Sequence, residues 1–254
     1  MKVITSPNNE TIKMIKHLRE NDNVFWWEGV KFFEEVIKES SKVKYLLLTQ
    51  ENMFKYEKKI KNLLVDNLIV VSERIFEKIS YTKTPQGIGG IIERKKWTLG
   101  DILKKEGPIF FLDGLQDPGN VGTIIRISDA FGFSGVLYKK NGVSPYNEKA
   151  VRSSAGSILR VPCYCIGDDE IEKLEVQSRP LYLLDTDANS AINIKKIKKE
   201  KLKNGIFFLG NEGKGLEVTL PKATKIFIPI KEQVNSLNVA VTAGIVAYIL
   251  GEVE

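Results

Sequence analysis

Polar side chains that could take part in chemistry occur in three short segments of the C-terminal half. The first segment, QDPGNVGTIIR, places Asn120 on a turn and Arg126 six residues later among isoleucines. Asn120 is suited to capping a helix, and Arg126 is spaced to pair with Asp129 on one helix face. Arg126 also lies four residues from both Gly122 and Ala130, and such small side chains let a ligand come close. The sequence leaves both interpretations of this arginine open.

The second segment, GNEGKGL over residues 210–216, is rich in glycine and follows an apolar run. Glycine lets backbone N–H and C=O groups approach a ligand closely. The spacing is not that of a dinucleotide fingerprint, and Lys214 is followed by Gly215 instead of the Ser or Thr of a phosphate-binding loop. Glu212 would repel a triphosphate but would suit an amine or a sulfonium cation. A solvated loop glutamate is the alternative.

The third segment, IPIKEQVNSLNVAVTAGIVAYIL, leads from a polar stretch into an almost wholly apolar helix over residues 239–250. A helix that is apolar on most sides is buried in a core or against a second subunit. Ser236 and Asn238 stand where an N-cap is expected. Capping accounts for one of them and leaves the other without a structural reason.

Short apolar runs of the type found in strands covered on both faces must position these three segments. We expect such strands over 109–114, 135–140, 159–165, 181–186, 205–210 and 226–230. Helical patterns lie between several of them, which predicts an α/β fold with a mostly parallel sheet. Ligands of such sheets bind beyond the carboxyl ends of the strands. All three segments begin at or follow such ends.

The first half of the chain also alternates between helices and strands. We expect helices over 11–20, over 28–40 and around 55–64, strands over 42–50 and 67–72, and a loop followed by a short strand within 81–94. The polar segment RKKWTLGDILKKEG then separates two apolar regions. We therefore predict one domain over 1–95, a linker over 96–106 and a second domain over 107–254.

Composition narrows the possible classes of protein. The 254 residues are 43% hydrophobic and 28% charged, which is a globular balance. A formal charge of +6 and a pI near 9.1 favour a polyanionic partner such as nucleic acid. No apolar run approaches the roughly 20 residues of a membrane-spanning helix, and the N-terminus lacks the apolar stretch of a signal peptide. These features predict a cytoplasmic protein without a membrane partner.

Residues that bind metals or act as acid–base catalysts are scarce. The two cysteines, Cys163 and Cys165, are best explained as small hydrophobic residues of one strand. The single histidine, His17, falls on a predicted surface helix. We therefore expect no metal site and no Ser-His-Asp triad.

Taken in order, LDGLQDPGNVGTIIRISDAFG, FFLGNEGKGL and IPIKEQVNSLNVAVTAGIVAYIL resemble the three motifs of the SpoU family of RNA ribose 2′-O-methyltransferases, part of the SPOUT superfamily. ITSPNNETIKMIKHL, FWWEGVKFFEEVI and ISYTKTPQGIGGII resemble the N-terminal substrate-binding domain of rRNA-directed members. The resemblance covers nearly the whole chain. It implies a small ribosomal-protein-like α/β RNA-binding domain, followed by a catalytic α/β domain with a C-terminal trefoil knot.

The resemblance also implies the reaction and its site. A methyl group passes from S-adenosylmethionine to a ribose 2′-hydroxyl of RNA, with rRNA favoured over tRNA, and the protein is a homodimer through its C-terminal domain. The residues that match cofactor-binding positions are Gly210, Asn211, Gly213, Ile228 and Leu237. Those that match polar active-site positions are Asn120, Arg126, Glu212, Ser236 and Asn238.

Several alternatives stay open. The RNA could be tRNA, or the chain could bind RNA without catalysis, although the polar site positions are intact. A nicotinamide- or nucleotide-dependent enzyme is disfavoured by the glycine spacing. The family's arginine is proposed to activate the hydroxyl, but a protonated guanidinium cannot accept a proton, so Arg126 is better suited to stabilising a developing alkoxide. Glu212 or a phosphate oxygen would then accept the proton.

Overall fold

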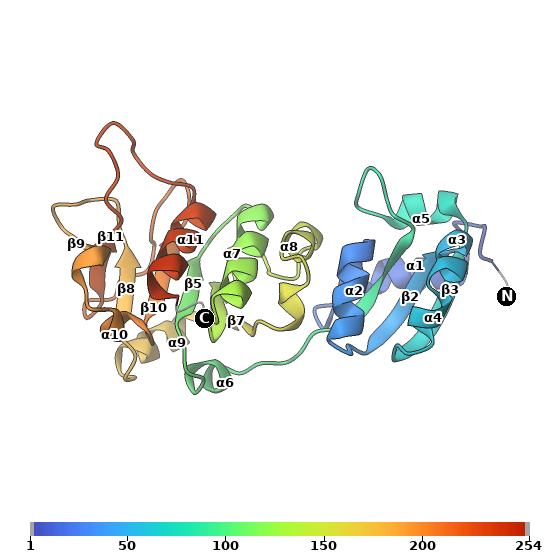
Figure 1. Ribbon diagram of the computed structural model, residues 1–254, viewed down its shortest axis with the longest axis horizontal. Coiled ribbons are helices and arrows are strands. Elements are labelled where there is room, and N and C mark those ends of the chain that lie inside the picture. Colours follow the sequence, from blue (N-terminus) through green and yellow to red (C-terminus); the bar gives the residue numbers. More distant parts are fainter. Residues whose placement is uncertain (1–2, 252–254) are drawn as a thin grey trace. The chain divides into compact units, whose positions relative to one another are not determined.

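The computed structural model describes residues 3–251, which form two compact units (Figure 1). The first unit comprises the described residues up to Lys96 together with Tyr146–Leu159. The second comprises Trp97–Pro145 and the described residues from Arg160 onward. The boundaries expected from the sequence do not include the return of residues 146–159 to the first unit.

The first unit is built on a mixed sheet with strand order β1-β4-β2-β3. β2 and β3 are parallel, whereas β4 is antiparallel to both of its neighbours. The strands are β1 (Val24–Glu28), β2 (Val43–Thr49), β3 (Val65–Val71) and β4 (Ile88–Glu93). The helices are α1 (Glu10–Leu18), α2 (Val30–Lys38), α3 (Gln50–Lys55), α4 (Glu57–Ile60), α5 (Glu73–Ile79), α8 (Glu148–Ser153) and the 3-10 turn η1 (Ser157–Leu159).

Helices cover both faces of this sheet. Successive side chains of a strand point to opposite sides, so buried side chains on each face pack against helices of their own. On β1, Trp26 joins the buried cluster that contains side chains of α1 and α5. Its neighbour Trp27 stacks on Phe32 and Phe33 of α2, with ring centroids 5.5 and 6.2 Å apart. Each tryptophan therefore anchors a different helical layer.

The predicted helices and strands of the first half are present, with three differences. The single basic helix expected around 55–64 is instead the pair α3 and α4, and α3 begins at Gln50 because the Thr49 side chain caps it. β1 and α5 were not expected. β1 begins with the four buried residues Val24–Trp27, and this short apolar run leads almost directly into the apolar pattern of α2.

The segment 146–159 packs with the first unit through the edge strand β1, which α8 contacts. The Tyr146 ring lies 5.6 Å from the Phe25 ring, measured between centroids, and the Arg94 guanidinium lies 4.4 Å from the Tyr146 centroid. The Lys95 ammonium donates to the carbonyl of Leu159 at 2.9 Å. These contacts give the sheet edge a cover and explain why the segment belongs to this unit.

The second unit contains a sheet of seven parallel strands in the described residues, in the order β7-β6-β5-β10-β8-β11-β9. The strands are β5 (Ile109–Asp113), β6 (Gly135–Lys139), β7 (Cys163–Ile166), β8 (Leu181–Leu184), β9 (Ile192–Asn193), β10 (Ile206–Gly210) and β11 (Thr224–Phe227). The helices are α6 (Leu99–Leu103), α7 (Pro118–Ala130), α9 (Asp168–Ile171), α10 (Lys199–Leu202) and α11 (Val239–Leu250), with η2 (Glu172–Glu175) and η3 (Ile194–Lys196). All six strands expected here are present, and the fold class is confirmed.

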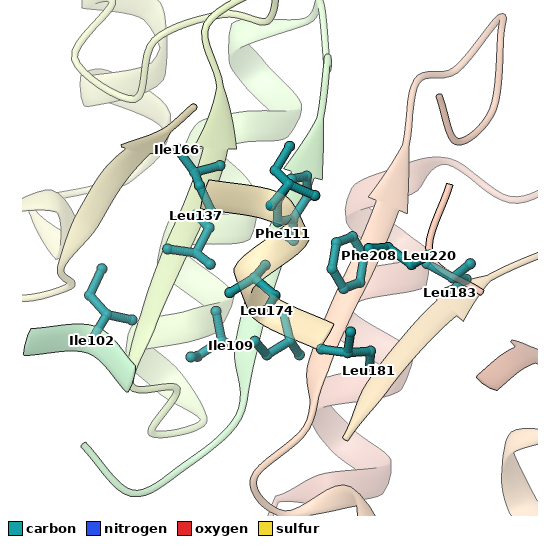
Figure 2. Packing of buried hydrophobic residues seen from close by; sticks show 12 residues of the cluster. Ile102, Ile109, Phe111, Leu137, Ile166, Leu174, Leu181, Leu183, Phe208 and Leu220 are labelled. Carbon is teal, nitrogen blue, oxygen red and sulfur yellow. The ribbon is translucent and has the colours of Figure 1, made fainter. Parts of the chain in front are cut away.

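The two faces of this sheet pack into separate layers. Figure 2 shows Phe111 and Phe208 on one face, in a cluster completed by the α6 side chain of Ile102. On β5, Phe110 points to the opposite face and stacks on Phe133 at a centroid distance of 4.1 Å. Ile102 comes from the segment expected as a linker, so this segment contributes to the core of the second unit. The trefoil knot implied by the resemblance stays a prediction.

Candidate active site

A pocket of 430 Å³ opens at the carboxyl ends of β8 and β10 and at the start of α11. Its walls come from the glycine-rich loop after β10, the segment after β11 and the polar residues before α11. Seven of the ten site residues predicted from the sequence line it: Gly210, Asn211, Glu212, Ile228, Ser236, Leu237 and Asn238. The fold thus brings the second and third sequence segments together at one cavity, as expected for a parallel sheet.

The loop after β10 is held by its own backbone and by one side chain. Asn211 and Gly215 exchange backbone hydrogen bonds of 2.8 and 2.9 Å. The Asn211 amide donates to the carbonyl of Gly114 at 2.9 Å, and its Oδ1 accepts the N–H of Gly213 at 2.8 Å. Asn211 therefore shapes the loop, and Gly213 takes part through its N–H without lining the pocket.

Gly210 is required by the close approach of the loop to the strand end. A Cβ at this position would lie 2.5 Å from the carbonyl carbon of Gly215 and 2.6 Å from the backbone nitrogen of Leu216. Any side chain would push the loop away from the strand. The width of the pocket at this point thus depends on a residue without a side chain.

A chain of hydrogen bonds joins the three sequence segments. The Asn120 amide donates to the Glu212 carboxylate at 2.8 Å, and the Asn238 amide donates to Asn120 Oδ1 at 3.1 Å. Asn238 also caps α11, because its Oδ1 accepts the N–H groups of Ala240 and Val241 at 2.9 and 3.2 Å. Asn238 thereby holds Asn120, and Asn120 orients the Glu212 carboxylate beside the pocket.

The expectation that Asn120 caps α7 is wrong. The cap is Asp117, whose carboxylate accepts the N–H of Gly119 at 2.8 Å, and Pro118 takes the first helical position. Proline suits that position because its missing N–H has no helical partner there. The Asn120 side chain is consequently free for the contact with Glu212.

Arg126 lies on the exposed side of α7. Its alternative partner is already taken, because Arg160 binds Asp129 through two nitrogens at 2.9 and 2.6 Å. Among the described residues, no hydrogen bond or ion pair of Arg126 occurs. The structure therefore does not bring Arg126 into contact with the pocket residues, and its guanidinium is available to an anionic partner.

The pocket suits a cationic organic ligand. Its volume falls within the range of about 300–1,000 Å³ typical of small-molecule sites. Leu209, Ile228 and Leu237 supply apolar surface, whereas Glu212 and Asp185 supply carboxylates. Burial acts to raise the pKa of Asp185, but hydrogen bonding from the Asp187 backbone and the ion pair with Lys225 outweigh it and lower that pKa. A sulfonium compound with an apolar ring system fits this combination.

Comparisons with known proteins show the family to which the chain belongs. A model of the SpoU rRNA Methylase family matches residues 107–248, which is more than half of the chain. The chain belongs to the SpoU rRNA methylase family. A model of the MRM3-like substrate binding domain matches residues 9–90.

Individual relatives of this SpoU family member span almost its whole length. It is 30% identical to the Bacillus subtilis 23S rRNA (guanosine(2553)-2'-O)-methyltransferase RlmP, over 98% of each chain. It is 28% identical to an uncharacterized tRNA/rRNA methyltransferase of Synechocystis, over 96% of this chain and 92% of that protein. The AdoMet-bound rRNA methyltransferase of Sinorhizobium meliloti superposes with a TM-score of 0.83 at 28% identity, covering 98% and 97% of the two chains.

Asp113 is a residue of the SpoU domain that the sequence analysis did not single out. It ends β5, its side chain is fully buried, and its Oδ2 accepts the N–H groups of Glu217 and Val218 at 2.6 and 2.9 Å. Its other oxygen lies 3.6 Å from the ammonium of Lys139. Asp113 thus fixes the far end of the loop that borders the pocket. A carboxylate at the end of the apolar run IFFLD was the available signal.

Two further observations concern partners of the SpoU family member. Within residues 3–251, no cluster of His, Cys, Asp and Glu has the arrangement of a metal site. No helix in the same part of the chain is long and apolar enough to cross a membrane.

Proposed function

We propose that this protein methylates a ribose 2′-hydroxyl of large-subunit rRNA, with S-adenosylmethionine as the methyl donor. The observation that carries the proposal is the chain from Glu212 through Asn120 to Asn238, which unites all three family motifs beside one pocket. S-adenosylmethionine, when bound, supplies an electrophilic methyl group. The protein must then orient a weakly nucleophilic hydroxyl and remove its proton.

Each predicted site residue has a role in this proposal. Gly210, Ile228 and Leu237 hold the cofactor, and Asn211 and Gly213 shape the loop beside it. Ser236 lines the pocket and is exposed, so its hydroxyl can contact a bound ligand.

Glu212, oriented by Asn120, is the acceptor of the hydroxyl proton in our proposal. The Asn120 amide donates to one oxygen of the Glu212 carboxylate at 2.8 Å, which leaves the second oxygen for the substrate. Arg126 stabilises the developing alkoxide or the adjacent phosphate, because a guanidinium donates hydrogen bonds and accepts none. This division of roles assigns proton transfer to the carboxylate and charge stabilisation to the arginine.

The RNA substrate is bound by the first unit, which comprises the described residues up to Lys96 together with Tyr146–Leu159, and the methyl group is transferred in the second unit. The match to a substrate-binding domain model supports this role. The name of the Bacillus subtilis relative supports rRNA over tRNA as the substrate, and an rRNA substrate in turn supports a cytoplasmic location. Methylation of tRNA, and RNA binding without catalysis, are the two alternatives.

We infer that a second copy of the chain covers a groove between α7 and α11. The groove is lined by Ile127 of α7 and by Val241, Gly244 and Tyr248 of α11. The apolar side chain of Val241 is 51% exposed, and the aromatic side chain of Tyr248 is 77% exposed. Exposed apolar surface of this type marks an interface. Asn120 and Asn238 line the same groove, so dimer formation and the active site share residues.

Transfer from tritiated S-adenosylmethionine to separately purified, unmodified rRNA and tRNA tests the proposal. We expect label in 23S rRNA alone. Label in tRNA alone would overturn the proposed substrate. Absence of label from both RNAs, with S-adenosylmethionine binding established by calorimetry, would favour RNA binding without catalysis.

A further inference from the structure

Three side chains of the first unit form a layered cluster. The guanidinium carbon of Arg19 lies 3.5 Å from the centroid of the Trp26 ring and 5.1 Å from that of the Tyr81 ring. The Arg19 Nη1 also donates to the carbonyl of Ile79 at 2.6 Å. Trp26 is buried, whereas Tyr81 is 53% exposed. Tyr81 is therefore the open end of the cluster.

The loop that carries Tyr81 is fixed at both ends. At its start, the Ser80 hydroxyl donates to the Glu28 carboxylate at 2.8 Å. At its end, the Asn52 amide donates to the carbonyl of Gln86 at 2.7 Å, and the Gln86 side chain accepts the N–H of Val30 at 2.8 Å. A ring held in this way loses little conformational entropy when it binds a partner.

A pocket of 270 Å³ adjoins the cluster, and its lining includes Trp26, Trp27 and Tyr81. Its charged residues are the cations Lys149 and Arg152 and the carboxylates Glu28 and Glu148. Its volume is below the roughly 300 Å³ at which sites for drug-sized molecules begin, and suits a single planar base.

Exposed cations occur on the pocket wall and on the loop that carries Tyr81. Lys83 is exposed two residues after Tyr81 on the same loop, and Arg152 is exposed on the pocket wall. Neither makes a hydrogen bond or ion pair with another described residue. Unpaired bases of RNA stack on aromatic side chains, and adjacent lysines and arginines neutralise the flanking phosphates. The combination favours single-stranded RNA over other partners.

We propose that Tyr81, supported by Arg19 and Trp26, stacks on an unpaired base of the RNA substrate, while Lys83 and Arg152 contact the flanking phosphates. This inference rests on the proposed function and adds to it the part of the RNA that the first unit recognises. An unpaired base has two open faces, so it can stack on the exposed tyrosine ring. A paired base inside a helix cannot.

The test compares variants of the full chain in binding an unmodified 23S rRNA transcript. Tyr81→Ala is expected to raise the Kd for the transcript by roughly 5- to 150-fold, the effect of removing one base-stacking aromatic. Tyr81→Phe keeps the ring and is expected to bind as the wild type does. Phe54→Ala is the matched control, because Phe54 is 71% exposed on α3 and lies outside the cluster. The affinity for S-adenosylmethionine should be unchanged in all three.

The dependence of Kd on salt separates stacking from charge. Lys83→Ala should reduce the slope of log Kd against log salt by about 0.7, the value for one contact with single-stranded nucleic acid. Tyr81→Ala removes no cation and should leave the slope unchanged. A reduced slope in Tyr81→Ala would mean that the substitution had displaced the loop, and would count against direct stacking.

The outcomes distinguish this inference from the proposed function. If the wild type neither binds nor methylates the transcript, the proposed function fails and the inference fails with it. If the wild type methylates the transcript and Tyr81→Ala binds it equally well, the stacking inference alone is overturned. An equal loss of affinity in Phe54→Ala and Tyr81→Ala would also overturn it, since the effect would not be specific to the cluster.

Discussion

Lys139 provides an internal comparison between a buried and an exposed carboxylate. Its ammonium lies 3.6 Å from Asp113 Oδ1 and 3.6 Å from Asp168 Oδ1, but the Asp113 side chain is 0% exposed and that of Asp168 is 90% exposed. Substituting each aspartate by alanine removes the same charge at the same distance. Any difference in stability between the two variants therefore measures the effect of burial and of the additional hydrogen bonds of Asp113.

The magnitude follows from the partners that Asp113→Ala leaves behind. The substitution leaves the N–H groups of Glu217 and Val218 without their acceptor. It also removes the buried counter-charge of Lys139, whose side chain is 16% exposed. Removing one partner of a buried pair costs about 3–5 kcal/mol. An exposed pair such as that of Asp168 contributes at most about 1 kcal/mol. We expect Asp113→Ala to destabilise the second unit by the larger amount and Asp168→Ala by the smaller.

Hydrogen exchange at the loop amides is the appropriate assay. A loss of about 3 kcal/mol in the free energy of opening corresponds to roughly 150-fold faster exchange, since about 1.36 kcal/mol equals a factor of ten. The N–H groups of Glu217 and Val218 should show this acceleration in Asp113→Ala, together with a higher KM for S-adenosylmethionine. Equal exchange rates in Asp113→Ala and Asp168→Ala would refute the role of the buried carboxylate.

Three other experiments test Arg126, the glycine-rich loop of the pocket and the two cysteines of β7. Arg126→Ala should lower kcat by about 10²–10³-fold without changing the affinity for S-adenosylmethionine, because losing one group that stabilises developing charge has an effect of this size. Near-normal turnover of this variant would refute the role of Arg126. Gly210→Ala should weaken cofactor binding in calorimetry, because its Cβ would lie 2.5 Å from a backbone carbon. Gly213→Ala is the control and should be tolerated, because a Cβ there meets only a side-chain oxygen at 3.6 Å. Equal affinities of the two variants for the cofactor would contradict the close approach at Gly210. Burial raises the pKa of Cys165 and of the fully buried Cys163, so little thiolate exists at neutral pH. A thiol reagent should modify Cys165 slowly, and faster as pH rises past the usual value of about 8.5, and should reach Cys163 only on unfolding; rapid modification of both at pH 7 would be inconsistent with this environment.

Much of the fold could be predicted because the strands of a doubly covered sheet are continuous apolar runs. β5, β6, β8 and β10 have this pattern, whereas β7 and β11 overlap the expected runs only in part, because β11 begins at Thr224 and ends at Phe227. β9 has two residues and no such pattern. α6 was hidden in a polar segment, although the Thr98 and Asp101 capping box that precedes Ile102 is visible in the sequence.

The candidate site was predictable in its parts and not in its contacts. The resemblance of the three motifs to the SpoU family implied Asn120, Glu212 and Asn238 as site residues. The rule that ligands bind beyond the carboxyl ends of parallel strands predicted that their segments lie together. The hydrogen bond between Asn120 and Glu212 joins residues 92 positions apart, and local spacing carries no information about it. The role of Asp113 depends likewise on which backbone amides approach it from a loop 104 residues away.

The chemical position of the transferred methyl group tests the central claim most directly. Tritium transferred from S-adenosylmethionine to 23S rRNA is followed by alkaline hydrolysis, which cannot cleave the chain after a ribose whose 2′-oxygen is methylated. We expect the label in alkali-resistant dinucleotides, and we expect it to be lost with Arg126→Ala. Recovery of the label in mononucleotides would assign the methyl group to a base and would contradict ribose 2′-O-methylation.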